Sequence, residues 1–131
     1  MKSLDTNILV RLLVNDDQAQ TKIVYDLFKK AEIEKEIFYI SHLVILELIW
    51  VLDSVYEINR TNLVEAIHQL TLMPLLQFED LNIINKFVHE SKKTNIDLAD
   101  LMIAISANLN GCEKTITFDK KAAKCHLFEL L

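Results

Sequence analysis

The chain has 131 residues, a formal net charge of −5 and 51% hydrophobic residues. A chain of this length is expected to form a single domain over residues 1–131, and its apolar content is too high for a disordered tail. It contains one glycine, Gly111, and one proline, Pro74. Dinucleotide-binding and Walker loops need several glycines, so both are excluded. An all-β sandwich or barrel, with its many Gly and Pro turns, is disfavoured.

Nothing in the sequence indicates export or insertion into a membrane. The first residues form no apolar signal segment and include the charged Asp5. No uninterrupted apolar run reaches the ~18 residues of a membrane span. The two cysteines, Cys112 and Cys125, fit a reducing compartment and are expected to be free thiols. We therefore expect a soluble cytoplasmic protein without a membrane partner.

Short strand-like runs alternate with segments of helical periodicity along the chain. Strands are predicted at residues 1–4, 37–40, 75–78, 115–118 and 126–130. Helices are predicted at residues 6–13, 16–35, 42–56, 61–73, 81–93, 98–110 and 119–124. Parallel strands need such helical connections, so the pattern predicts the α/β class, with a mostly parallel sheet of four or five strands and helices on both faces.

Residues at the ends and on the faces of these helices refine the prediction. Three residues are expected N-caps, and one is an expected left-handed residue at a helix C-terminus. The N-caps are Ser41, Thr61 and Asp80, and the left-handed residue is Gly111. In the helix at residues 16–35, one face is expected to carry Ile23, Leu27 and Ala31, with Val24 and Phe28 beside them.

Four acidic residues occupy positions that suggest a functional site. Asp5 and Asp119 directly follow predicted strands, where an acid caps the next helix and also lies at the sheet edge that binds ligands. Glu47 and Asp100 are the only charged residues in two long apolar helical segments, so both are expected to be buried. A buried carboxylate is neutralised by a salt bridge or by a cation. With only two arginines in the chain, a metal cation is favoured over a salt bridge.

The chemistry of these acids indicates the class of metal and reaction. Carboxylates that converge on one crevice repel each other and bind cations. A ligand set made of oxygen alone suits Mg²⁺ or Mn²⁺, and the four histidines show no metal-ligand spacing that would favour zinc. One or two such ions activate water and stabilise the leaving oxygen of a phosphodiester. The residues alone therefore indicate metal-dependent phosphoryl hydrolysis.

Four motifs, in this order along the whole chain, resemble those of the PIN-domain family. They are residues 4–11, Glu47 in mid-chain, residues 100–107, and Gly111 and Cys112 followed by residues 115–119. Small stand-alone PIN domains of this length are similar to the VapC toxins of bacterial and archaeal toxin–antitoxin pairs. The resemblance implies an α/β/α sandwich and an endoribonuclease that depends on Mg²⁺ or Mn²⁺. It also implies a homodimer and a small antitoxin whose C-terminal part occludes the active site.

The resemblance also implies roles for individual residues. Asp5, Glu47 and Asp100 match the core catalytic acids that hold the metal, and Asp119 matches a more variable fourth. Thr6 and Asn7 match the polar residues that accompany the first acid, and Thr117 matches a hydroxyl position near the metal. Asp97 is either a supporting acid or the N-cap of the helix that carries Asp100, and the cap is favoured. The basic residues expected to contact RNA phosphates are Arg11, Lys120, Lys121 and Lys124.

Other functional classes fit the sequence less well. A haloacid-dehalogenase-type phosphatase needs a second Asp two residues after the first, where this chain has Asn7. A receiver domain needs an acid pair near its first strand and a late lysine after a strand, and neither is evident. The remaining alternative is a non-catalytic PIN-like module for protein interaction or RNA binding. Such a module has no physical reason to keep Glu47 and Asp100 in apolar helices, so these acids favour the nuclease.

Overall fold

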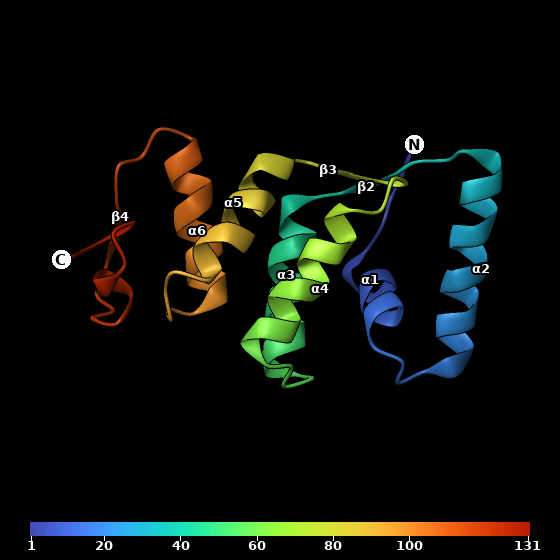
Figure 1. Cartoon of the computed structure of the whole chain (residues 1–131), viewed down its shortest axis with the longest axis horizontal. Coiled ribbons are helices and arrows are strands. Elements are labelled where there is room, and N and C mark those ends of the chain that lie inside the picture. The colour runs from blue at the N-terminus through green and yellow to red at the C-terminus, as the bar shows by residue number, and fades with distance from the viewer. The chain divides into compact units, whose positions relative to one another are not determined.

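The computed structural model describes all residues from Met1 to Leu131 and contains six α-helices, five short strands and one 3-10 helix (Figure 1). The chain divides into two compact units, Met1–Glu79 and Asp80–Leu131, and each has its own small sheet. None of the helices combines the length and the apolar character needed to cross a membrane.

The sheet of the first unit has three parallel strands in the order β1-β2-β3. The strands are β1 (Lys2–Ser3), β2 (Phe38–Ile40) and β3 (Leu76–Phe78). The helices are α1 (Thr6–Leu13), α2 (Gln18–Glu34), α3 (His42–Ser54) and α4 (Arg60–Thr71). Helix α1 contacts α2 and α3, α3 contacts α4, and α4 contacts β3. Each pair of adjacent strands is joined through helices, which is the connection that parallel pairing requires.

Packing between α2 and β2 forms part of the core of the first unit. The rings of Phe28 in α2 and Phe38 in β2 stack with centroids 5.8 Å apart, and both residues are buried. Val24 and Ala31 lie on the same buried face of α2 as Phe28. The sequence placed Ile23 and Leu27 on this face, but both are exposed. Because the apolar residues of α2 cover more than one face, their periodicity alone does not select the face that meets the sheet.

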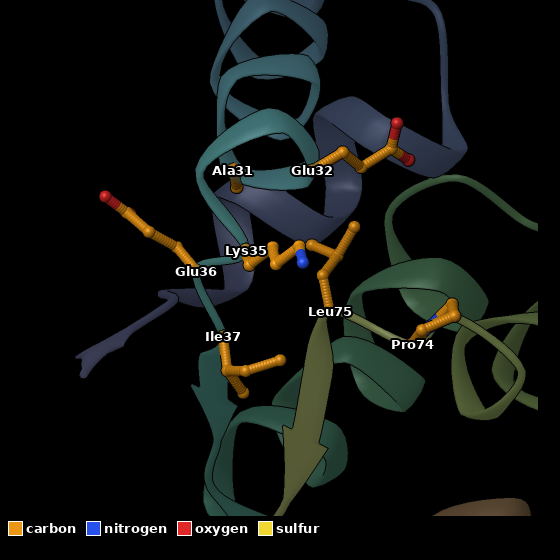
Figure 2. Close-up of a pocket in the computed structure, with 7 residues that line it drawn as sticks. All are labelled: Ala31, Glu32, Lys35, Glu36, Ile37, Pro74 and Leu75. Carbon is orange, nitrogen blue, oxygen red and sulfur yellow. The ribbon is translucent and has the colours of Figure 1, made fainter.

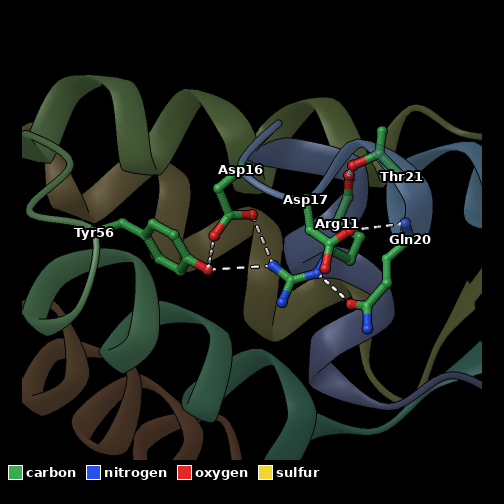
Figure 3. A network of polar contacts seen from close by, with 6 residues as sticks. All are labelled: Arg11, Asp16, Asp17, Gln20, Thr21 and Tyr56. Atoms are coloured by element: carbon green, nitrogen blue, oxygen red, sulfur yellow. Dashed lines mark hydrogen bonds and ion pairs between the residues drawn. The ribbon is translucent and has the colours of Figure 1, made fainter.

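Arg11, at the end of α1, joins three parts of the first unit through side-chain hydrogen bonds (Figure 3). Its Nη1 donates to Asp16 Oδ1 at 2.8 Å, and its Nε donates to Gln20 Oε1 at 2.6 Å. The hydroxyl of Tyr56, in the segment after α3, donates to Asp16 Oδ2 at 2.7 Å. The hydrogen bond from Tyr56 and the charge of Arg11 lower the pKa of Asp16. The network thus ties α1 to the start of α2 and to the end of α3.

The second unit contains a pair of helices and a two-stranded parallel sheet. Helix α5 (Leu81–Ser91) packs against α6 (Leu98–Leu109), and the short 3-10 helix η1 (Ala122–Lys124) connects β4 (Thr115–Thr117) to β5 (Phe128–Leu130). The buried residues of the two helices include Ile84 and Phe87 in α5 and Leu101 and Ile105 in α6. Helix α6 ends before Gly111, whose φ of +95° confirms the predicted left-handed residue.

The structure confirms the α/β class, and all observed strand pairs are parallel. The five strands form two sheets of three and two strands, whereas one sheet was expected. The predicted N-caps Ser41 and Asp80 accept backbone hydrogen bonds as expected. Thr61 does not cap α4, because Asn59 occurs earlier and accepts a bond from the N–H of Asn62 at 2.9 Å. Both cysteines are free, and Cys125 is buried.

The network around Arg11 predicts that Asp16 stabilises the protein in a pH-dependent manner. The folded-state pKa of Asp16 lies below its ordinary value of 3.8. Its stabilisation is therefore fully present above pH 3.8 and is lost as the pH falls through the lowered folded-state pKa. Asp16→Asn is expected to lower the Tm by a few degrees at neutral pH and to match the parent in strong acid.

Thermal unfolding followed by circular dichroism across pH measures this difference. Asp53→Asn is the matched control, because Asp53 is an exposed acid on α3 that forms no ion pair. A variant at position 16 that unfolds at the parent's Tm at neutral pH would show that the network contributes nothing to stability.

Candidate functional site

The acids singled out by the sequence divide between the two units. Asp5 and Glu47 belong to the first unit, and Asp100 and Asp119 belong to the second. Each of the four lies in or next to a different helix or strand. The hydrogen bonds and the exposure of each carboxylate show whether its oxygens are available to a ligand.

Asp5 directly follows the residue after β1 and is the N-cap of α1. Its Oδ1 accepts a hydrogen bond from the backbone N–H of Thr6 at 2.7 Å. Thr6 is only 2% exposed, whereas Asp5 and Asn7 are exposed. The capping bond fixes the carboxylate at the carboxyl end of a strand and occupies one of its two oxygens. Capping and ligand binding are therefore compatible at this position.

Glu47 is exposed, so the expectation that it is buried is wrong. Helix α3 leaves one stripe uncovered, on which Glu47 lies between Leu43, 77% exposed, and Trp50, 57% exposed. The buried side of the helix carries Ile45, Leu48, Ile49 and Leu52. Because α3 carries apolar residues on all sides, all sides were expected to be buried. The exposed Leu43 and Trp50 show that packing covers only part of this helix. Glu47 forms no salt bridge, and its carboxylate is accessible.

Three acids of the second unit lie within electrostatic range of one another. Asp97 is the N-cap of α6, as the sequence favoured, and its Oδ1 accepts a bond from the N–H of Asp100 at 3.0 Å. Asp100 lies in the first turn of α6 and is partly buried. Burial, followed by the charges of Asp97 and Asp119, raises the pKa of Asp100. No salt bridge neutralises this carboxylate, which contradicts the alternative of a structural ion pair.

Asp119 is held by the turn that follows β4. Its backbone N–H donates to Thr117 Oγ1 at 3.0 Å. Its Oδ1 accepts bonds from the N–H groups of Lys121 at 2.8 Å and Ala122 at 3.2 Å. These bonds begin the turn that leads into η1 and fix the carboxylate through one oxygen. The Thr117 hydroxyl therefore orients the backbone of Asp119. The second carboxylate oxygen of Asp119, Oδ2, forms no hydrogen bond.

Glu79 is an acid at the strand ends that the sequence reasoning missed. It follows β3, and its Oε1 accepts bonds from the hydroxyl of Tyr39 and the N–H of His42, both at 3.1 Å. These two bonds lower its pKa. Nδ1 of the partly buried His42 has no hydrogen-bond partner. The signal that could have identified Glu79 is the one used for Asp5, an acid next to the carboxyl end of a predicted strand.

The basic residues expected to contact RNA differ in whether their side chains already bind other residues of the protein. Arg11 is bonded to Asp16 and Gln20 within the network of the first unit. By contrast, three lysines of the second unit are exposed and form no ion pair. They are Lys120, Lys121 and Lys124.

The first unit also contains a pocket of about 310 Å³ (Figure 2). Its wall includes Ile37 and Leu75, which directly precede β2 and β3, together with Lys35 and Pro74. The pocket is therefore at the amino ends of the strands. Ligands of parallel α/β sheets bind at the carboxyl ends, where Asp5 and Glu79 lie, so this pocket is not the candidate catalytic site.

The donor chemistry of the acids suits a hard cation, although no three His, Cys, Asp or Glu side chains form a group that could hold a metal ion in the structure. Asp100 and Asp119 offer carboxylate oxygens, the ligands that Mg²⁺ and Mn²⁺ prefer. The partly buried Asp100 has no cationic partner within the protein. The carboxylate oxygens of these residues are therefore suitable ligands for a divalent ion.

The acids around Asp100 predict the effect of removing its charge. In Asp100→Asn the backbone bond to Asp97 is kept, while the desolvation of the charge and its repulsion by Asp97 and Asp119 disappear. In EDTA the variant is expected to have a Tm equal to or above the parent's. Because the pKa of Asp100 is raised, the metal-free parent should also gain stability as the pH falls from neutral toward that pKa.

Addition of Mn²⁺ completes this test. Mn²⁺ should raise the Tm of the parent and of the control Asp53→Asn, but not that of Asp100→Asn, because a ligand stabilises only a protein that binds it. A Tm of Asp100→Asn clearly below the parent's in EDTA would instead show that the carboxylate stabilises the fold.

Comparison with known protein families finds one family whose model matches residues of both units. A family model of the PIN domain matches residues 2–125. No curated protein matches the chain significantly. The PIN domain is generally a nuclease domain, and PIN nucleases generally use divalent metals. Because the matched residues span most of the chain, the protein belongs to the PIN domain family.

Proposed function

We propose that the protein is a metal-dependent endoribonuclease that hydrolyses RNA phosphodiester bonds. The observation that carries the proposal is the placement of Asp100, which is partly buried beside Asp97 and Asp119 without a basic partner. Carboxylates in such a place cost free energy in the folded protein unless a cation binds them. The PIN domain, generally a nuclease domain, supplies the reaction class.

In this proposal Asp5, Glu47, Asp100 and Asp119 hold Mg²⁺ or Mn²⁺ as oxygen ligands. When bound, such an ion neutralises charge on the phosphoryl group and promotes attack by water at neutral pH. The rest of the chain keeps the acids in place. The N–H of Thr6 fixes one oxygen of Asp5. Three further polar residues support the acids from nearby positions, namely Asn7, Asp97 and Thr117.

The substrate and partners follow from the charges of the chain. The exposed Lys120, Lys121 and Lys124 would receive phosphates of the RNA backbone, while Arg11 has only Nη2 outside its network. We further propose that the protein is the toxin of a type II toxin–antitoxin pair and forms a homodimer. PIN domains often pair with antitoxins, and a small antitoxin would inhibit this one by covering the acids with its C-terminal part.

Cleavage of a structured RNA pool by the purified protein tests the nuclease directly. The parent is expected to cut RNA in Mn²⁺ or Mg²⁺ and to lose activity in EDTA. Asp5→Asn and Asp100→Asn should each lower the rate by more than about 100-fold, because even residues that only support metal ligands contribute about 10- to 100-fold. Asp53→Asn controls for the same change in net charge.

Each other outcome has a defined meaning. Cleavage that survives EDTA or Asp100→Asn would contradict the assignment of the acids. A Tm raised by Mn²⁺ without cleavage would indicate a metal site whose substrate is not in the pool. If Mn²⁺ changes neither the Tm nor the RNA, the non-catalytic interaction module replaces the nuclease.

A further inference from the structure

A pocket of about 300 Å³ within the second unit is lined by positively charged side chains. Its wall is built from two segments, the one between α5 and α6 and the one around η1. The lining residues are Lys93, Thr94, Asn95, Ile96, Lys121 and Lys124. Three of the six carry a positive charge and none carries a negative one, which gives this pocket the character of an anion site.

The charges of these lysines are largely uncompensated within the protein. Lys121 and Lys124 form no ion pair, and both are exposed. Lys93 is 3.8 Å from Glu90 and its side chain is 59% exposed. The Glu90 side chain is only 13% exposed, so it compensates part of the charge of Lys93, whereas Lys121 and Lys124 have no anionic partner. The lining of the pocket therefore carries a net positive charge, which attracts an anion.

The same two segments also carry the acids of the second unit. Asp97 directly follows Ile96 of the pocket wall, and Asp119 lies two residues before Lys121. Acids and lysines of opposite charge are thus neighbours in the chain, yet no salt bridge joins Asp97, Asp100 or Asp119 to a lysine of the pocket. The acids remain available for a cation and the lysines for an anion.

We propose that this lysine pocket binds a backbone phosphate of the RNA, next to the phosphate that is cleaved. The inference rests on the proposed nuclease function and adds Lys93 and the pocket to it. The volume would hold about ten water molecules, so it has room for a phosphate group with part of its sugar. Because lysines contact phosphate as point charges and read no base, the pocket would position RNA without selecting its sequence.

Binding of fluorescein-labelled single-stranded RNA, measured by fluorescence anisotropy in EDTA, tests the pocket without cleavage. The test variant is Lys93→Gln, because Lys93 is the lysine that only the pocket inference assigns to RNA. The matched control is Lys29→Gln, which removes the same charge from an exposed lysine of α2. The pocket variant is expected to bind roughly tenfold more weakly and to lose about 0.7 from the magnitude of the slope of log K against log salt. Two RNAs of unrelated sequence should lose affinity equally, while the control variant keeps the parent's affinity and slope.

Parallel cleavage assays separate this inference from the nuclease proposal. If the parent cleaves RNA and the pocket variant matches the control variant in affinity, slope and KM, the pocket inference is overturned and the nuclease stands. If the pocket variant loses affinity while the parent does not cleave, the pocket stands and the nuclease fails. A parent that binds no RNA overturns both. Unchanged circular dichroism and Tm of the variants confirm that they fold.

Discussion

Burial of the Asp100 carboxylate at the start of α6, together with repulsion by the charges of Asp97 and Asp119, is the constraint on which the proposed chemistry depends. Asp100 is partly buried there beside Asp97 and Asp119, and its raised pKa records the cost of the charge. The surrounding structure fixes these acids instead of neutralising them. Asp97 caps the helix that carries Asp100, and the turn around Thr117 holds one oxygen of Asp119. The charges of these carboxylates destabilise the folded protein when no cation is present, and a bound cation would neutralise them.

The organisation of opposite charges gives the second unit its proposed role in binding RNA. Acids that hold a cation and lysines that hold a phosphate would act on adjacent parts of one nucleic-acid chain. The protein as a whole carries a net charge of −5, which opposes RNA binding at long range. Binding would therefore depend on the local lysines and on neutralisation of the acids. The same chain can be acidic overall and still act on a polyanion.

Local signals in the sequence predicted much of the fold. The bounds of α1, the caps Ser41 and Asp80, and the left-handed Gly111 depend on a few neighbouring residues, and all four agree with the structure. Features that depend on distant packing were predicted less well. The exposure of Glu47 and the division of the strands into two sheets are of this kind. The lysine pocket escaped prediction because it depends on two segments that are far apart in the sequence, whereas Glu79 carries the same local signal as Asp5 and was overlooked. Whether residues 1–131 act as one domain stays a prediction.

Binding of a cation at Asp100 is measured most directly by an anomalous-scattering map from crystals of the protein grown with Mn²⁺. A strong peak is expected within coordinating distance of the carboxylate of Asp100, with further oxygen ligands from the other proposed acids. The same map from Asp100→Asn crystals should lack that peak. A map of the parent protein without an ion at Asp100, at a concentration of Mn²⁺ that supports RNA cleavage, would contradict the proposed metal site.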